Sequence, residues 1–169
     1  RFGRISREDL GKFHQAQLWV YETMVAPVLK SGIILGINDK IRAKIGVEPN
    51  WIKGIKAGGI KSQELYAHAE CIIQMADTYE NLPRIGFEAM ASGSMLIVDD
   101  RGGWRDLVMH GQTGFLCKDQ REFVYYASRA AFEAQERRQM IAAARDWLES
   151  NWGIEQAKAE WSRFFNAIT

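Results

Sequence analysis

The feature that most constrains the fold of this chain is a strict alternation of short apolar runs with helix-like segments across residues 1–117. The apolar runs have the length of buried strands, and no Asn-Gly or Asp-Gly hairpin signal joins one run to the next. Strands that are separated by helices pair in parallel, through right-handed crossovers. The sequence therefore predicts an α/β domain with a six-stranded, mainly parallel sheet and helices on both faces. The predicted strands are residues 1–5, 33–37, 51–55, 71–75, 94–98 and 115–117.

The helices are predicted from capping residues and from apolar positions at helical spacing. Ser6, followed three residues later by an acid, has the character of a capping box for a helix that stops near Pro27. After residue 117 the pattern changes to helices only, and Asp119 caps the first of them. The remaining predicted helices cover residues 40–45, 64–69, 84–92 and 136–149, with a last one around Trp161.

Composition places the chain among ordinary globular domains. Its 169 residues are enough for one domain with a core and too few for two. No apolar run approaches the ~20 residues of a membrane span, and the chain starts with neither a secretory nor a transit signal. Cys71 and Cys117 are predicted to be buried thiols, which indicates a reducing compartment and a cytoplasmic location.

The net charge of +1 conceals an uneven distribution. Residues 1–61 contain eleven Lys and Arg but only five Asp and Glu. A basic leading third suits an anionic ligand, although solvated helix faces explain the same count equally well. The density of charge is far below that of a nucleic-acid-binding arm, so no nucleic-acid partner is expected.

Two glutamates, Glu80 and Glu88, mark the stretch of residues 78–93 as a candidate site. It follows the predicted strand 71–75, and Pro83 stands where a helix can begin without losing a hydrogen bond. Glu80 then lies in the loop after a strand and Glu88 about one turn into the next helix, where open α/β sheets bind ligands. Carboxylates there can accept hydrogen bonds from sugar or ribose hydroxyls. The alternative is an N-terminal charge and a solvated helix glutamate.

Other polar groups give weaker signals. Asp99 and Asp100 invite comparison with a D-x-D metal clamp, but their spacing is wrong. The histidines form no ligand spacing either, so no metal site is predicted; they are His14, His68 and His110. The pair Gly102-Gly103 lacks both the G-x-G-x-x-G pattern and the lysine of phosphate-binding loops.

A resemblance to a known family emerges when the motifs are taken in order. The run E-N-L-P-R-I-G-F-E-A-M-A-S-G at residues 80–93 is followed by G-G-W-R-D-L-V-M-H-G at 102–111 and T-G-F-L at 113–116. Together these motifs resemble the donor-binding half of retaining GT-B glycosyltransferases of the glycosyl transferases group 1 type. The resemblance covers nearly the whole chain. It implies that residues 1–169 form a single, Rossmann-like nucleotide-sugar-binding domain, which is one half of a GT-B fold.

The resemblance also implies roles for charged residues. Arg4 stands at the end of the first predicted strand, and Lys12 follows eight residues later. Family members hold the donor diphosphate with an arginine and a lysine at this strand end; surface charge is the alternative. Glu80 is implied to lie beside the donor sugar, and Glu88 to accept hydrogen bonds from the ribose hydroxyls. Arg4, Lys12 and Glu80 are thus the expected catalytic residues.

The donor-binding residues are implied by the loops around these groups. Many family members have glycine where this chain has Pro83, so one N–H donor is missing, but the next two N–H groups remain. The loop of residues 57–61 is implied to lie beside the nucleobase, or else is a flexible turn. The expected donor-binding residues are Glu88, Arg84, Ile85, Gly58, Gly59, Ile60, Gly102 and Gly103.

The implied function is transfer of a glycosyl group from a nucleoside diphosphate sugar to an acceptor, with retention and without a metal or cofactor. Such hexosyltransferases serve glycan biosynthesis, and an acceptor in a membrane would bring peripheral membrane association. Family enzymes have two similar-sized domains, so the N-terminal acceptor domain is expected to be absent and this domain to be inactive alone. The alternatives are a nucleotide-sugar-binding module without transferase activity, or an epimerase or hydrolase on the same fold.

The C-terminal helix carries too many large apolar groups for a solvated end: Trp161, Phe164, Phe165 and Ile168. In similar enzymes the terminal helix crosses back to the other domain. In that case the isolated domain exposes an apolar patch or forms a homodimer. The alternative is that these side chains cover the sheet of their own domain.

Overall fold

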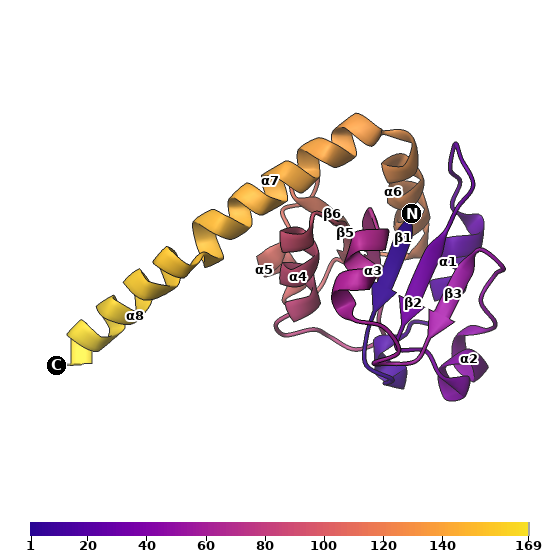
Figure 1. The fold of residues 1–169 in the computed structure, drawn as a ribbon, viewed down its shortest axis with the longest axis horizontal. Helices are drawn as coiled ribbons and strands as arrows, with labels where there is room; N and C mark the ends of the chain where they lie inside the picture. The colour runs from indigo at the N-terminus through magenta and orange to yellow at the C-terminus, as the bar shows by residue number, and fades with distance from the viewer. Residues whose placement is uncertain (169) are drawn as a thin grey trace.

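Six short strands form one sheet in which every neighbouring pair is parallel. The computed structural model describes residues 1–168 and confirms the predicted α/β class (Figure 1). The order across the sheet is β3-β2-β1-β4-β5-β6. The strands are β1 (Phe2–Ile5), β2 (Gly32–Leu35), β3 (Ile52–Ile55), β4 (Cys71–Gln74), β5 (Met95–Asp99) and β6 (Gly114–Cys117).

The strand order creates one topological switch point. From β1 the chain moves outward to β2 and β3, and then returns to β4 on the other side of β1. Phe2 is therefore in register with Gly32 on one side and with Cys71 on the other. The loops that leave the carboxyl ends of β1 and β4 run in opposite directions, which opens a crevice between them.

Apolar side chains fill both faces of the sheet. Along β4, Cys71 and Ile73 belong to one core cluster and Ile72 to the other, because successive side chains of a strand point to opposite faces. Helices cover both clusters, as is usual for a parallel sheet. The helices are η1 (Leu10–Lys12, a 3-10 turn), α1 (Gln17–Thr23), α2 (Asp39–Ile45), α3 (Ser62–His68), α4 (Arg84–Ser92), α5 (Trp104–Leu107), α6 (Gln120–Phe132), α7 (Ala134–Trp152) and α8 (Ile154–Ile168).

The helices predicted after β2 are all present, but the first predicted helix is wrong in extent. No α-helix begins at Ser6; Asp9 instead caps the short η1 by accepting a 2.8 Å hydrogen bond from the Gly11 amide. The α-helix starts only at Gln17. The His14 amide donates to the Met75 carbonyl at 3.3 Å, so long-range contacts hold the intervening segment out of helical conformation. The short α5 was not predicted.

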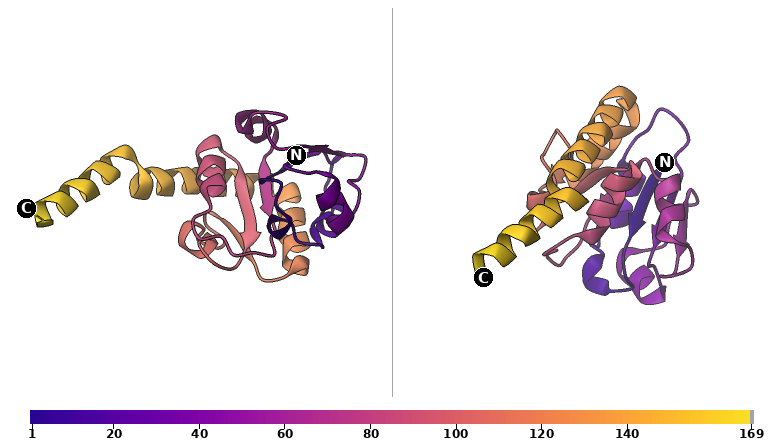
Figure 2. Two further views of the ribbon diagram at one scale, coloured as in Figure 1. Left: turned by 90° about the horizontal axis from the view of Figure 1, so that it is seen from below. Right: turned by 60° about the vertical axis from the view of Figure 1, so that its left-hand side comes forward.

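The terminal helix α8 projects away from the sheet and continues the direction of α7 (Figures 1 and 2). Every residue of α8 is exposed. Trp161, Phe164 and Phe165 pack on one another, with ring centroids 5.5–5.9 Å apart. The alternative in which these side chains cover their own sheet is therefore wrong. None of the helices in residues 1–168 combines the length and the apolar character needed to cross a bilayer.

Candidate functional site

A cleft of about 310 Å³ lies at the switch point, between the carboxyl ends of β1 and β4 and the start of α4. Its volume is in the range of small-molecule sites. One wall follows β1, a second follows β4, and α5 contributes one aromatic side chain. The lining residues are Ile5, Ser6, Arg7, Lys12, Gln74, Ala76, Glu80, Leu82, Pro83, Arg84, Ile85 and Trp104.

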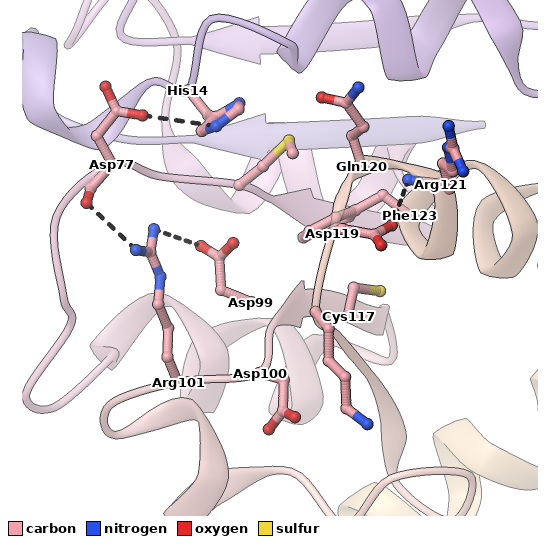
Figure 3. A pocket seen from close by; sticks show the side chains of 12 residues that line it. His14, Asp77, Asp99, Asp100, Arg101, Cys117, Asp119, Gln120, Arg121 and Phe123 are labelled. Atoms are coloured by element: carbon pink, nitrogen blue, oxygen red, sulfur yellow. Dashed lines mark hydrogen bonds and ion pairs between the residues drawn. The ribbon is translucent and has the colours of Figure 1, made fainter.

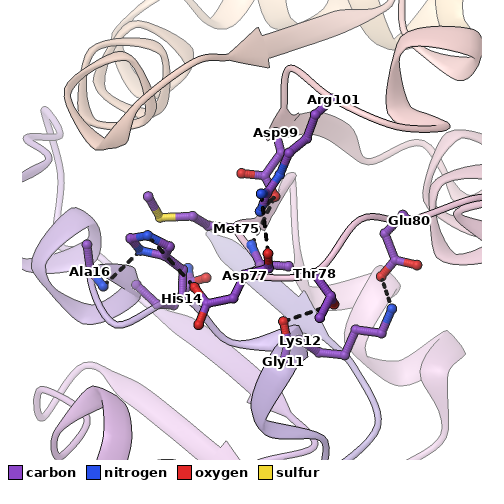
Figure 4. Close-up of polar contacts among 12 residues, drawn as sticks. Gly11, Lys12, His14, Ala16, Met75, Asp77, Thr78, Glu80, Asp99 and Arg101 are labelled. Atoms are coloured by element: carbon purple, nitrogen blue, oxygen red, sulfur yellow. Dashed lines mark hydrogen bonds and ion pairs between the residues drawn. The ribbon is translucent and has the colours of Figure 1, made fainter.

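Lys12 and Glu80 meet in this cleft, although 68 positions separate them in the chain. The Lys12 Nζ lies 2.7 Å from Glu80 Oε1, and the two side chains are 18% and 22% exposed (Figure 4). An ammonium group has three donors. Two protons of Lys12 therefore remain for a ligand while Glu80 keeps the group in place.

The Gly11 carbonyl ties the two walls of the cleft together. It accepts hydrogen bonds from the amides of Asp77 and Thr78, both at 3.0 Å, and from Thr78 Oγ1 at 3.1 Å (Figure 4). Lys44 of α2 adds a 2.6 Å ion pair to Asp77 Oδ2. The segments that carry Lys12 and Glu80 are thus fixed relative to each other by backbone and side-chain contacts.

The two glycines of the β5–α5 connection support the Glu80 segment from behind. The Gly103 amide donates a 2.6 Å hydrogen bond to the Glu80 carbonyl. A Cβ at Gly103 would lie 2.0 Å from the Asn81 carbonyl oxygen, and one at Gly102 would lie 2.5 Å from the Glu80 carbonyl oxygen. Neither glycine lines the cleft. The prediction that these glycines bind the donor is therefore wrong. They allow the β5–α5 loop to approach the Glu80 segment closely.

Arg4 does not reach the cleft, which corrects its predicted placement. Its side chain is fully buried on the side of α1, where the guanidinium lies 3.8 Å from the centre of the Phe13 ring. The Nε donates to Gln17 Oε1 at 3.1 Å, and Nη2 donates to the carbonyls of Lys12 and Met75. Burial lowers the pKa of Arg4 to about 10. Arg4 therefore holds backbone groups that carry the cleft, rather than a ligand in it.

Arg7 lines the cleft although no sequence motif indicated it. Its exposed side chain lines the cleft beside Lys12 and has no hydrogen-bond or ion-pair partner within residues 1–168. The available signal was position, because Arg7 is the second residue after the carboxyl end of the first strand. Together with Arg84, these residues bring three cations to the cleft, against the single carboxylate of Glu80.

The first turn of α4 lines the cleft and leaves one of its amides without a backbone partner among residues 1–168. The Arg84 amide donates a 2.9 Å hydrogen bond to the Leu82 carbonyl, so the prediction that it is free for a ligand is wrong. The Gly86 amide donates to the Pro83 carbonyl at 2.7 Å. The Ile85 amide between them has no backbone partner in the part of the chain described. A helix N-terminus with a free amide favours an anion.

Glu88 lies outside the cleft, one turn beyond Arg84 on the same face of α4. It is exposed, and its Oε2 accepts a 3.1 Å hydrogen bond from Tyr66 Oη. The loop after β3 does not line the cleft either. In that loop Gly58 has a φ of 77° with open space around it, whereas Ile60 packs against the core.

A second cleft, of about 490 Å³, lies at the carboxyl ends of β4, β5 and β6 (Figure 3). Asp99 is its most buried carboxylate. The Asp99 Oδ2 accepts a 2.9 Å hydrogen bond from the Ala76 amide and lies 3.6 Å from Arg101 Nη2. Burial nevertheless raises the pKa of Asp99 to about 6, because desolvation outweighs both contacts.

The raised pKa of Asp99 predicts how stability varies with pH. Below about pH 4 the carboxyl is protonated in both the folded and the unfolded chain. Between about pH 4 and pH 6 the folded chain binds more protons, so the free energy of unfolding falls as the pH rises. Asp99→Asn keeps an acceptor for the Ala76 amide and should raise stability at pH 7 by about 1–2 kcal/mol.

The measurement is denaturant unfolding at about pH 4.5 and pH 7, with the exposed Asp106→Asn as the matched control. Asp99→Asn should flatten the dependence on pH, and the control should leave it as in the wild type. A dependence that is the same in all three proteins would contradict the assignment of this titration to Asp99.

The sequence of residues 52–147 matches the profile of a known family, Glycosyl transferases group 1. The match covers more than half of the chain, so the chain belongs to this family. The match confirms the family that the motifs indicated.

The chain is also similar to individual proteins. Spore coat protein SA of Bacillus subtilis (strain 168) is 29% identical over 95 residues, which are 54% of this chain and 25% of the relative. Anabaena Alr3699/HepE, solved in complex with UDP and glucose, superimposes with a TM-score of 0.81 at 17% identity. A point mutant of S. aureus TarM, solved in complex with fondaparinux, alpha-GlcNAc-glycerol and UDP, gives a TM-score of 0.78 at 20% identity.

The structural matches cover nearly all of this chain but only part of each relative. The superposition spans 98% of this chain in both cases, against 48% of HepE and 35% of TarM. At these identities the likeness shows the fold alone. The chain therefore has the fold of one half of a GT-B glycosyltransferase, with the helical C-terminus included in the match.

Proposed function

We propose that this chain is the donor-binding domain of a glycosyltransferase and binds a nucleoside diphosphate sugar in the cleft at the switch point. The observation that carries the proposal is the meeting of Lys12 and Glu80 at the start of α4, between Arg7 and Arg84. The cations suit a diphosphate, and the carboxylate suits a sugar hydroxyl. HepE, which shares the fold, was solved with UDP and glucose, which supports this ligand class.

Each group has a role in this proposal. Lys12, Arg7 and the Ile85 amide hold the diphosphate, and Arg84 adds charge at the mouth of the cleft. As the glycosidic bond breaks, negative charge develops on the diphosphate, and these donors are already oriented toward it. Glu80 orients the sugar, and the transfer proceeds with retention. No metal ion is required, because the side chains supply the positive charge.

Glu88 is proposed to bind the ribose. It lies four residues beyond Arg84, a rise of about 6 Å along the helix, which is comparable with the step from a phosphate to its ribose. Its Oε1 remains available to a ligand, because Tyr66 bonds only to Oε2. The loop of residues 57–61, at the start of α3, is the proposed neighbour of the base.

Glycosyl transfer also needs an acceptor site. The chain spans about half the length of HepE, and we assign acceptor binding to a further domain, in a cytoplasmic enzyme of glycan biosynthesis. The described domain is then expected to bind a nucleotide weakly, because a cleft with one wall missing leaves the ligand hydrated. A binding module without transferase activity would have the same cleft. Turnover by residues 1–169 alone would contradict the assignment of acceptor binding to a further domain.

The experiment is calorimetric titration with UDP, GDP, ADP and CDP, followed by the tightest of them and its 2′-deoxy form. Glu88→Ala should weaken the ribonucleotide about 10-fold, the effect of losing one charged hydrogen bond, and should abolish the preference for ribose. The matched control is Glu149→Ala, an exposed glutamate on α7. An unchanged ribose preference in Glu88→Ala would remove Glu88 from the site, and absence of binding by all four nucleotides would refute the proposed function.

A further inference from the structure

Tyr66 is a buried side chain on α3 that contacts Glu88, the proposed ribose-binding residue on α4. It lies on α3, is 4% exposed, and belongs to the core cluster on that face of the sheet. Its hydroxyl lies 3.1 Å from Glu88 Oε2 and 3.3 Å from the Ile85 carbonyl oxygen. Both partners are on α4, so this one hydroxyl connects the two helices beside the cleft.

The hydroxyl can act only as a donor toward these partners. A carboxylate and a carbonyl are both acceptors. Burial and the neighbouring Glu88 raise the pKa of Tyr66, so the proton stays on the phenol at neutral pH. The ring is held by the core, and the donor position is therefore defined before any ligand arrives.

A fixed donor matters because Glu88 is otherwise an exposed glutamate. A long, solvated side chain samples several rotamers, and holding it in one of them costs conformational entropy. The bond to Oε2 selects one rotamer and leaves Oε1 open. The acceptor of this hydrogen bond is a carboxylate, and such a bond is stronger than one between neutral groups.

We propose that Tyr66 is a positioning residue for the ribose of the bound nucleotide: it orients the Glu88 carboxylate so that Oε1 accepts from a ribose hydroxyl. This inference rests on the proposed function, in which Glu88 binds the ribose. It predicts that loss of the Tyr66 hydroxyl affects the preference for ribose over deoxyribose, in addition to any effect on folding.

The test is Tyr66→Phe, which keeps the ring in the core and removes only the hydroxyl. Tyr126→Phe is the matched control, because its hydroxyl also contacts a polar side chain, His110 at 3.2 Å, away from the cleft. The full chain is titrated with the tightest nucleoside diphosphate and with its 2′-deoxy form. Tyr66→Phe should lower the affinity for the ribonucleotide about 3- to 10-fold, as expected for one hydrogen bond. The ratio of the affinities for the ribonucleotide and its 2′-deoxy form should fall by a similar factor.

A double-mutant cycle distinguishes the inference from the proposal beneath it. In a Glu88→Ala background, Tyr66→Phe should have no further effect on the ribose preference. If Glu88→Ala abolishes that preference while Tyr66→Phe retains it, Glu88 binds the ribose without help and the inference is wrong. If Glu88→Ala also retains the preference, the ribose assignment fails and the inference fails with it. A lower melting temperature of Tyr66→Phe with unchanged preference would show a purely structural role and would overturn the inference.

Discussion

Replacing Lys12 by methionine is expected to lower the affinity for a nucleoside diphosphate about 10- to 100-fold. The lost interaction is a hydrogen bond between two charged groups, of a kind that contributes about 1.5–3 kcal/mol. The change also leaves Glu80 without its 2.7 Å ion-pair partner, and an unpaired carboxylate in the cleft repels a diphosphate. Methionine preserves the unbranched shape of the side chain, so the fold should be retained.

Titration calorimetry of Lys12→Met, the wild type and the control variant Lys53→Met measures this effect. Lys53 is exposed on β3 and lies outside the cleft, so the control removes the same net charge at a distance. A similar loss of affinity in both variants would point to the overall charge rather than to Lys12. Wild-type affinity in Lys12→Met would exclude Lys12 from the diphosphate site.

Gly103→Ala is expected to destabilise the domain by about 3 kcal/mol, at the upper end of the effects of overpacking. The added Cβ would lie 2.0 Å from the Asn81 carbonyl oxygen. The oxygen belongs to the backbone and the position of the Cβ is fixed by it, so no side-chain rotation relieves the contact. The φ of Gly103 is −65°, so the effect comes from the steric clash and not from backbone strain. Because Gly103 also bonds to the Glu80 carbonyl, relief of the clash must displace Glu80 and weaken nucleotide binding.

Urea unfolding and nucleotide titration together measure this second effect. Gly111→Ala is the matched control, because its Cβ would meet open space, its φ of 76° imposes strain of about 1–2 kcal/mol, and it does not line the cleft. The control should lose some stability and keep the wild-type affinity for the nucleotide. Wild-type stability of Gly103→Ala would mean that the two loops are not in the contact described.

The sheet was predictable because its strands are buried on both faces. In such strands the apolar residues run on without alternation, as in β4, and a short uninterrupted run is a strong local signal. The end of α4 was predictable for a similar reason, since Gly93 adopts the left-handed conformation that glycine favours, with a φ of 80°. The start of α1 was not predictable, because contacts with residues far along the chain determine the path through His14.

The candidate site was predictable in its members and less so in their orientations. Lys12 and Glu80 were found from their motifs, and the structure places them together. The direction of the Arg4 side chain could not be inferred, because a strand pattern with both faces buried does not say which face adjoins a cleft. The glycines at 102 and 103 carry no chemistry of their own, and their effect on Glu80 depends on a contact between two loops that the sequence does not reveal.

The burial of Arg4 has a consequence for the ionic-strength dependence of binding. Arg7 is exposed and Lys12 is partly exposed, so dissolved ions screen their attraction for a phosphate over a Debye length of about 8 Å at physiological salt. Arg4 has no ion-pair partner within residues 1–168 and is sealed from solvent behind the backbone of Lys12. Its field reaches the cleft through protein, where mobile ions do not enter. Added salt should therefore weaken the contribution of Arg4 to the positive potential of the cleft less than the contributions of Arg7 and Lys12.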